Sequence, residues 1–298
     1  MREFADRVLS FGQSSIDVMT GICMKHRPIM LAAGTPGMDA PPELVKIAEK
    51  YLQKGHNQYT VNRGSPRLRT AIAQKWSGVL ERSIDPETEV TVTCGATEAL
   101  LAAAMAVLNP GDRALVFEPF YENFRSIAHL SGGVVDLVPL LPPAWEPDMG
   151  ILRQKAPGAK LLIINSPGNP TGGVFSGETL RKIAKIAAEN DLFVISDETY
   201  RGMVYDAAEP PSIASLPGMA ERSFVLSSFS KNMTATGWRV GYGVAAPPLT
   251  EQFRKVHDFA SICAPAPFQD AIAEYWRSDE FEIYFRGLMA DYREKRDI

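Results

Sequence analysis

The chain alternates between short apolar runs and longer segments in which apolar residues recur every three or four positions. The longer pattern, clearest over residues 178–189, is typical of a helix with one buried face. The short runs are rich in β-branched residues and predict buried strands over residues 90–93, 114–117, 134–138, 161–164, 193–196, 223–226 and 240–244. Strands that alternate with helices predict an α/β fold, with a mostly parallel central sheet and helices on both faces.

Further helices are predicted before and after this alternating region. Residues 42–52 have a helical apolar face, and Ser65 followed by Pro66 predicts a capped helix that runs through Trp76. The last part of the chain predicts helices over residues 249–261 and 267–276 and from residue 280 onward. Because that final segment reaches Ile298 without a stop signal, we expect the chain to be cut inside a helix.

Composition and charge exclude several classes of protein. The 298 residues include 31 Lys and Arg against 35 Asp and Glu, a net charge of −4, with no basic block to attract nucleic acid. The apolar run at 99–108 is shorter than the roughly 20 residues of a membrane span and predicts a buried helix. The 3 cysteines and 4 histidines are scattered, which predicts neither disulfides nor a metal site. With no secretory signal at its start, we expect a cytoplasmic protein.

Polar and glycine-rich segments follow the predicted strands, where open α/β sheets place their ligand sites. These segments are CGATE at 94–98, NSPGNPTG at 165–172, SDETY at 196–200, and SSFSKN at 227–232 leading to GWRVG at 237–241. In these motifs, their order and their separations, the sequence resembles the class I (fold-type I) pyridoxal-phosphate-dependent aminotransferases over nearly its whole length. The KVHD segment at 255–258 and GWRVG look most similar to the kynurenine, glutamine and methionine transaminase branch.

The resemblance implies a transaminase. Such an enzyme moves an amino group between an L-amino acid and a 2-oxo acid by a ping-pong mechanism, with pyridoxal 5'-phosphate as cofactor. Two alternatives stay open at this point. One is a carbon–sulfur β-lyase of the same fold, since both reactions pass through a carbanion, and the other is a cofactor-binding protein with little turnover.

Lys231 and Asp197 match the two residues that act on the cofactor's reactive ends. By resemblance Lys231 forms the Schiff base and then carries the proton, which requires a site that disfavours the ammonium form. Asp197 pairs with the pyridine nitrogen and keeps it protonated, so that the ring accepts electrons. The plain alternatives are a solvated surface lysine and an aspartate that caps a turn.

Three further residues match contacts to the cofactor ring. Asn169 and the catalytic residue Tyr200 match groups that hydrogen-bond the phenolic oxygen, and Tyr121 matches the aromatic residue stacked on the ring. Each also has an ordinary explanation. An Asn-Pro pair is common in turns, and single tyrosines at such spacing are common in cores.

The resemblance also implies a phosphate site. Gly95, Ala96 and Thr97 open the predicted apolar helix, whose first N–H groups favour an anion. Ser228 and Arg239 match the hydroxyl and guanidinium ligands of the phosphate.

Two residues near the start of the chain complete the expected site. Tyr59 matches a tyrosine that reaches the neighbouring subunit's phosphate, which implies a homodimer. Gly34, together with Asn169, matches positions that line the substrate pocket. A loop tyrosine packed locally and an ordinary Gly-Thr-Pro-Gly turn are the alternatives.

These expectations divide the chain into an N-terminal arm at 1–28, a large cofactor-binding domain at 29–277, and the first part of a small α+β domain at 278–298. The family's carboxylate-binding arginine normally lies beyond this point, and no arginine here has a matching context. For His257 we expect helix packing rather than a catalytic role.

Overall fold

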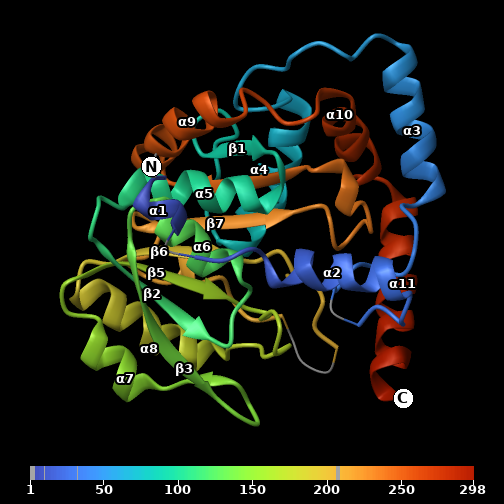
Figure 1. Cartoon of the computed structure of the whole chain (residues 1–298). Helices are drawn as coiled ribbons and strands as arrows, with labels where there is room; N and C mark the ends of the chain where they lie inside the picture. The colour runs from blue at the N-terminus through green and yellow to red at the C-terminus, as the bar shows by residue number, and fades with distance from the viewer. Residues whose placement is uncertain (1–3, 10, 32, 206–208) are drawn as a thin grey trace.

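The computed structural model describes residues 4–9, 11–31, 33–205 and 209–298 (Figure 1). Its centre is an 8-stranded sheet in the order β1-β8-β7-β6-β5-β2-β3-β4. The strands are β1 (Val90–Thr93), β2 (Arg113–Glu118), β3 (Val134–Leu141), β4 (Glu146–Pro147), β5 (Ala159–Asn165), β6 (Phe193–Asp197), β7 (Ser223–Ser228) and β8 (Gly241–Ala245).

The sheet is mostly parallel, as predicted. Strand β8 runs antiparallel to both of its neighbours, β1 and β7, and the short β4 runs antiparallel to β3. The pairs β2–β3, β2–β5, β5–β6 and β6–β7 are parallel. The start of β8 therefore lies at the same edge of the sheet as the carboxyl ends of β1, β2, β5, β6 and β7.

Where a helical segment was predicted, the helix of the structure agrees with it to within a few residues, but the helices at 6–9, 15–26, 123–130 and 149–155 were not predicted individually. The helices have these bounds in chain order. They are α1 (Asp6–Leu9), α2 (Ser15–His26), α3 (Pro42–Gln53), α4 (Pro66–Val79), α5 (Gly95–Val107), α6 (Asn123–Leu130), α7 (Met149–Lys155), α8 (Gly177–Glu189), α9 (Pro247–Ala260), α10 (Ala266–Tyr275) and α11 (Asp279–Asp297), with short 3-10 turns η1 (Ile213–Ser215) and η2 (Thr236–Trp238). Within the described residues, no helix is both long and apolar enough to cross a membrane.

Helices cover both faces of the sheet because successive strand residues point to opposite sides. In β5, Leu161 and Ile163 pack in the cluster that contains α5 and α9, whereas Leu162 and Ile164 pack in the cluster that contains α7 and α8. Figure 1 shows α5 and α9 on one side of the sheet and α7 and α8 on the other. The predicted two-sided α/β arrangement is confirmed.

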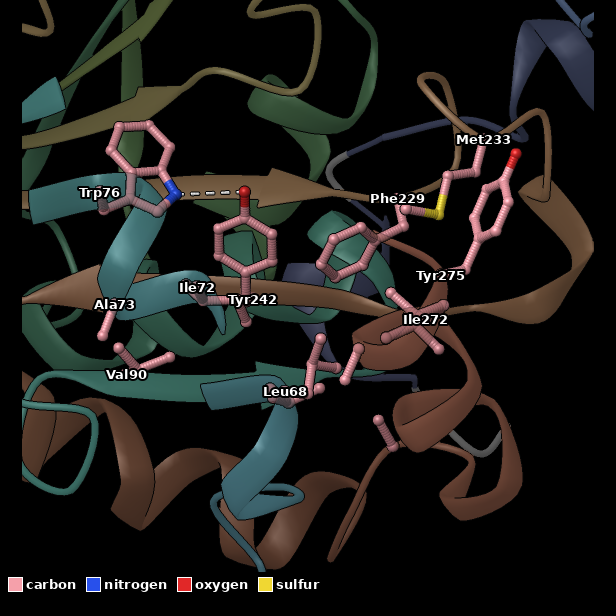
Figure 2. Packing of buried hydrophobic residues seen from close by; sticks show 14 of the residues in the cluster. Leu68, Ile72, Ala73, Trp76, Val90, Phe229, Met233, Tyr242, Ile272 and Tyr275 are labelled. Atoms are coloured by element: carbon pink, nitrogen blue, oxygen red, sulfur yellow. Dashed lines mark hydrogen bonds between the residues drawn. The ribbon is translucent and has the colours of Figure 1, made fainter. Parts of the chain in front are cut away.

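A third cluster packs α3, α4 and α10 against the β1–β8 end of the sheet. Figure 2 shows its centre, where the Trp76 indole N–H donates to the Tyr242 hydroxyl at 3.1 Å. Phe229, at the end of β7, packs on both Tyr242 and Trp276. This cluster anchors the segment that follows β7.

The predicted start of α4 is confirmed, but Ser65 does not cap it through its side chain. The Ser65 hydroxyl instead donates to Asp270 on α10, and its backbone N–H donates to the Gln269 side chain at 2.7 Å. A tertiary contact to α10 thus replaces the local capping bond.

Candidate active site

The polar segments singled out in the sequence meet at one edge of the sheet. Those at 94–98, 165–172 and 196–200 follow the carboxyl ends of β1, β5 and β6. Lys231 and Arg239 lie on the connection from β7 to β8, which the backbone bond from Phe229 N to Val240 O (3.1 Å) closes. The reversed direction of β8 brings Arg239 to this edge from the start of a strand.

The amine of Lys231 lies among polar and aromatic groups of this edge. Its Nζ donates to the Gly34 carbonyl at 3.3 Å and lies 5.9 Å from the centroid of the Tyr200 ring. Burial lowers the pKa of Lys231, and the positive charge of Arg239 lowers it further. Lys231 is therefore poised to act as a neutral amine more readily than a solvated lysine.

Asp197 ends β6, directly opposite Asn165 at the end of β5. Its Oδ1 accepts the Thr199 backbone N–H at 3.0 Å, while Asn165 Nδ2 donates to its backbone carbonyl at 3.0 Å. Burial raises the pKa of Asp197, because the hydrogen bonds from Thr199 do not offset the lost hydration. A protonated nitrogen placed against this carboxylate would restore its ionised form.

Asn169 and Tyr200 are neighbours across the ends of β5 and β6. Asn169 Nδ2 donates to the Tyr200 hydroxyl at 3.4 Å, and the Asn169 backbone N–H donates to the Asn165 side chain at 2.7 Å. Burial, followed by the negative charge of Asp197, raises the pKa of Tyr200 to about 12. The tyrosine therefore keeps its proton and can donate it in a hydrogen bond.

Tyr121 follows β2 and is partly buried beside the same carboxylate. Burial raises the pKa of Tyr121, and the charges of Glu122 and Asp197 raise it further. Its hydroxyl accepts from Asn123 Nδ2 at 3.0 Å, and its ring meets Phe124 edge-on, with centroids 5.8 Å apart. Both contacts come from the start of α6, the helix that follows Tyr121, and they fix the orientation of the ring.

Gly95, Arg239 and Gly241 form a close-packed turn at the start of α5. Gly95 has φ +78°, and a Cβ on it would collide with the Arg239 guanidinium. A Cβ on Gly241 would collide with the backbone of Gly95 and Ala96. Glycine is required at both positions because backbone and guanidinium approach each other so closely. Ser228 lies opposite Gly241 in the β7–β8 register.

The remaining predicted site residues differ in their contacts and in their exposure to solvent. Gly34 contributes a carbonyl to Lys231, Ser228 is buried, and Thr97 is exposed on the first turn of α5. The Tyr59 side chain is 77% exposed, on the loop between α3 and α4.

Two residues with structural contacts here were not assigned a role from the sequence. Asn165 connects β5, β6 and the turn at Asn169. Glu122 accepts from the backbone N–H and hydroxyl of Ser15, at 2.9 and 2.6 Å, and from the Ser14 hydroxyl, which holds the start of α2 beside Tyr121. Asn165 is the first residue of the motif at 165–172, so the sequence offered a reason to consider it. Glu122 contacts Ser15, 107 residues away, and no local pattern indicates that contact.

Comparison with known proteins agrees with this geometry. The family model "Aminotransferase class I and II" matches residues 27–297. Methionine aminotransferase of Escherichia coli is 34% identical over 96% of this chain and 74% of its own length. Kynurenine–oxoglutarate transaminase 1 of Homo sapiens is 32% identical over 87% of this chain and 65% of its own.

Solved structures share the fold. N-succinyldiaminopimelate aminotransferase from Mycobacterium tuberculosis superposes with a TM-score of 0.93 and 34% identity, over 99% of this chain and 77% of that one. The family uses pyridoxal phosphate to transfer amino groups. On the family match and these likenesses, the chain belongs to the class I and II aminotransferases.

Proposed function

We propose that this chain binds pyridoxal 5'-phosphate at the sheet edge through Lys231 and passes an amino group from an L-amino acid to a 2-oxo acid. The observation that carries the proposal is the position of Lys231. Its partly buried amine, with a lowered pKa, lies beside Tyr200 at the strand ends that also carry Asp197 and Asn169. When bound, the cofactor supplies an electron-accepting ring that stabilises negative charge on the amino acid's Cα.

The residues at this edge fit the cofactor. A partly buried carboxylate with a raised pKa, Asp197, suits the protonated ring nitrogen and would ionise once that charge is near. Tyr200 and Asn169, which are in contact with each other, would donate an O–H and an N–H to a phenolic oxygen. Tyr121 offers a ring held in a fixed orientation for stacking.

The phosphate group would sit at the start of α5. The backbone of Gly95, Ala96 and Thr97 supplies N–H donors and the positive end of the helix dipole. Arg239 adds a guanidinium held against Gly95, and Ser228 adds a hydroxyl. The close packing at Gly95, which leaves no space for a side chain, is the local observation that supports an anion cradle here.

Lys231 would serve two purposes in the reaction. Its amine would hold the cofactor through the aldehyde, and once released the same amine would accept and give back the proton of the substrate Cα. The lowered pKa favours the neutral amine that both tasks require. Gly34, whose carbonyl contacts Lys231 Nζ, and Asn169 would line the substrate side.

We further propose that the active site is shared between two copies of the chain, with Tyr59 reaching the partner's phosphate. Support comes from exposed side chains that a partner would cover, including Tyr59 (77% exposed) and Phe259 (93% exposed). Mixing Tyr59→Ala with Lys231→Ala subunits tests this. If the site is shared, hybrid dimers contain one intact site and regain exchange activity that neither variant has alone.

The division of the chain that we propose follows the sequence prediction. An arm at 1–28 contains α2, which has no buried residue, residues 29–277 hold the sheet and its helices, and α11 lies in 278–298. We propose a cytoplasmic location, in keeping with three cysteines that are all free thiols.

An absorbance titration of the purified protein tests the central proposal. We expect a visible band with added pyridoxal phosphate, which methionine, kynurenine or N-succinyldiaminopimelate shifts and a 2-oxo acid restores. Lys231→Ala should abolish this exchange, whereas Lys255→Ala, at an exposed lysine on α9, should retain it. Exchange that persists in Lys231→Ala would overturn the assignment, and pyruvate release without any 2-oxo acid would indicate lyase chemistry.

A further inference from the structure

His257 is a fully buried histidine on α9, outside the segments that form the proposed cofactor site. Its two ring nitrogens both face oxygen atoms. Nδ1 lies 2.7 Å from Glu98 Oε1, and Nε2 lies 2.7 Å from the Asn62 carbonyl. A backbone carbonyl only accepts hydrogen bonds, so Nε2 carries a proton, and an ionised Glu98 requires a second proton on Nδ1.

Glu98 connects this pair to the turn proposed for the phosphate. It lies in the first turn of α5, and its second carboxylate oxygen accepts the backbone N–H of Cys94 at 2.5 Å. Cys94 directly precedes Gly95 and occupies the N-cap position of α5, without a capping bond from its own side chain. The carboxylate therefore fixes the direction in which the chain enters α5, and so the N–H groups that follow.

Asn62 connects the pair to the loop that carries Tyr59. The neighbouring residue Arg63 accepts the Val92 backbone N–H at 3.0 Å through its carbonyl, and Gly64 has φ +99° with its Cα against the Val92 side chain. The loop therefore rests on β1, the strand that ends in the Cys94–Gly95 turn. Through His257, loop and turn also share a side-chain connection.

We propose that His257 is a positioning residue that holds the phosphate-binding turn at 94–98 and the Tyr59 loop at 57–64 in one fixed arrangement, acting through Glu98 and Asn62. The proposal rests on the proposed function in taking the first of these segments as the phosphate site. A residue that only filled space could be apolar, whereas His257 makes two short hydrogen bonds to two different segments.

The surroundings of His257 support a charged, fully bonded ring. Burial opposes its protonation, but the hydrogen bond and charge of Glu98 outweigh this and raise the pKa of His257, with smaller contributions from Asn62 and Asp258. The Ser261 hydroxyl, 3.3 Å from Nδ1, is the remaining polar neighbour. The buried ring thus replaces its lost hydration with contacts to both segments.

Three variants separate positioning from packing. His257→Phe removes both donors, whereas Glu98→Gln keeps every contact. The new side-chain amide can accept from Cys94 through its oxygen and donate to a neutral His257 through its nitrogen, and Nε2–H still reaches Asn62.

Glu98→Ala removes the carboxylate that would be left buried and unpaired in His257→Phe, so it serves as a second variant if His257→Phe does not fold. It removes the contact to the turn at 94–98 and keeps the bond from His257 to Asn62. Ile183→Ala, in the other core cluster on α8, is the control for lost stability.

Two measurements on the full chain test these variants, and one of them does not involve the cofactor. The first is amide hydrogen exchange of residues 57–64 and 94–98 in the cofactor-free protein. The second is the dissociation constant of pyridoxal phosphate, followed by absorbance. We expect His257→Phe to accelerate exchange in both segments and to weaken cofactor binding about tenfold, in line with the loss of a hydrogen bond to a charged group.

We expect Glu98→Gln, which keeps the contacts but not the charge, to change both measurements less than His257→Phe does, and Glu98→Ala to accelerate exchange at 94–98 only. The proposal is overturned if His257→Phe leaves one of the two segments protected, or if Ile183→Ala matches its effects on both. A chain that binds no cofactor at all would refute the proposed function while leaving the exchange test of His257 intact.

Discussion

The guanidinium group of Arg239 occupies the space in which a side chain on Gly95 would begin. The left-handed backbone of Gly95 (φ +78°) adds a second constraint at the same position. Gly95→Ala should therefore both strain the backbone, by roughly 1–2 kcal/mol, and displace Arg239. We expect a lower free energy of unfolding in urea and a large loss of pyridoxal phosphate affinity.

Gly218→Ala is the matched control for this substitution. Gly218 also has a positive φ (+74°), but a Cβ there meets nothing within 4 Å. It should lose a similar free energy of unfolding and keep cofactor affinity. Equal affinity loss in the two variants would show that the contact between Gly95 and Arg239 is not what supports the site.

Arg239 should also increase the rate at which the Lys231 amine reacts with an aldehyde at neutral pH. After burial, the charge of Arg239 is what lowers the pKa of that amine. Arg239→Gln should raise the lysine pKa, so that less neutral amine is present and capture of pyridoxal slows several-fold at pH 7. Using pyridoxal, which lacks the phosphate, excludes the loss of a phosphate contact. Arg239→Lys keeps the charge, and its capture rate should follow that of the unchanged chain across pH.

Tyr242 and Trp76 should contribute to stability through their buried hydrogen bond (Figure 2). Tyr242→Phe leaves the indole N–H without this acceptor, at a cost of about 1–3 kcal/mol in the free energy of unfolding. Urea denaturation of Tyr242→Phe, Trp76→Phe and the double variant gives the coupling directly. Additive losses would contradict a stabilising bond between the two side chains.

Glu122 should make the docking of α2 depend on pH. Burial opposes ionisation of Glu122, but the hydrogen bonds from Ser14 and Ser15 outweigh it and lower the pKa of this carboxyl below that of an ordinary glutamate. A carboxylate with a lowered folded-state pKa stabilises above its unfolded value, and this contribution is lost as pH falls through the folded value.

Hydrogen exchange of residues 15–26, corrected for intrinsic pH dependence, measures this docking. We expect protection above pH 5 that declines in more acidic solution, and little protection at any pH in Glu122→Gln. Glu118→Gln, at an exposed carboxylate at the end of β2, serves as the control and should leave the profile unchanged. A profile in Glu122→Gln that matches the unchanged chain would rule out this anchor.

The sequence predicted the strands and the motif-bearing turns because both depend on local information. The continuous apolar run at 161–164 and the glycine at position 95 can be recognised from neighbouring residues alone. The helix α2 was not predicted, because its apolar residues, which include Val18, Met19, Ile22 and Met24, are spread around the helix instead of forming one face.

Contacts between distant parts of the chain could not be predicted in this way. His257 was expected to serve helix packing, and its helix and burial agree with that, but its bonds to Glu98 and Asn62 span 159 and 195 residues. The Ser65 hydroxyl likewise donates to Asp270 and does not cap its own helix. Such pairings depend on how α9 and α10 pack, which no local pattern contains.

The connection from β7 to β8 carries both Lys231 and Arg239 and is tied at its base by the bond between Phe229 and Val240. Lys231 and Arg239, whose charge lowers the pKa of the Lys231 amine, are therefore separated by a fixed number of residues within one closed loop. An insertion or deletion between Lys231 and Arg239 would displace the amine relative to the proposed phosphate ligand. Homologous chains should thus vary in the composition of this loop far more readily than in its number of residues.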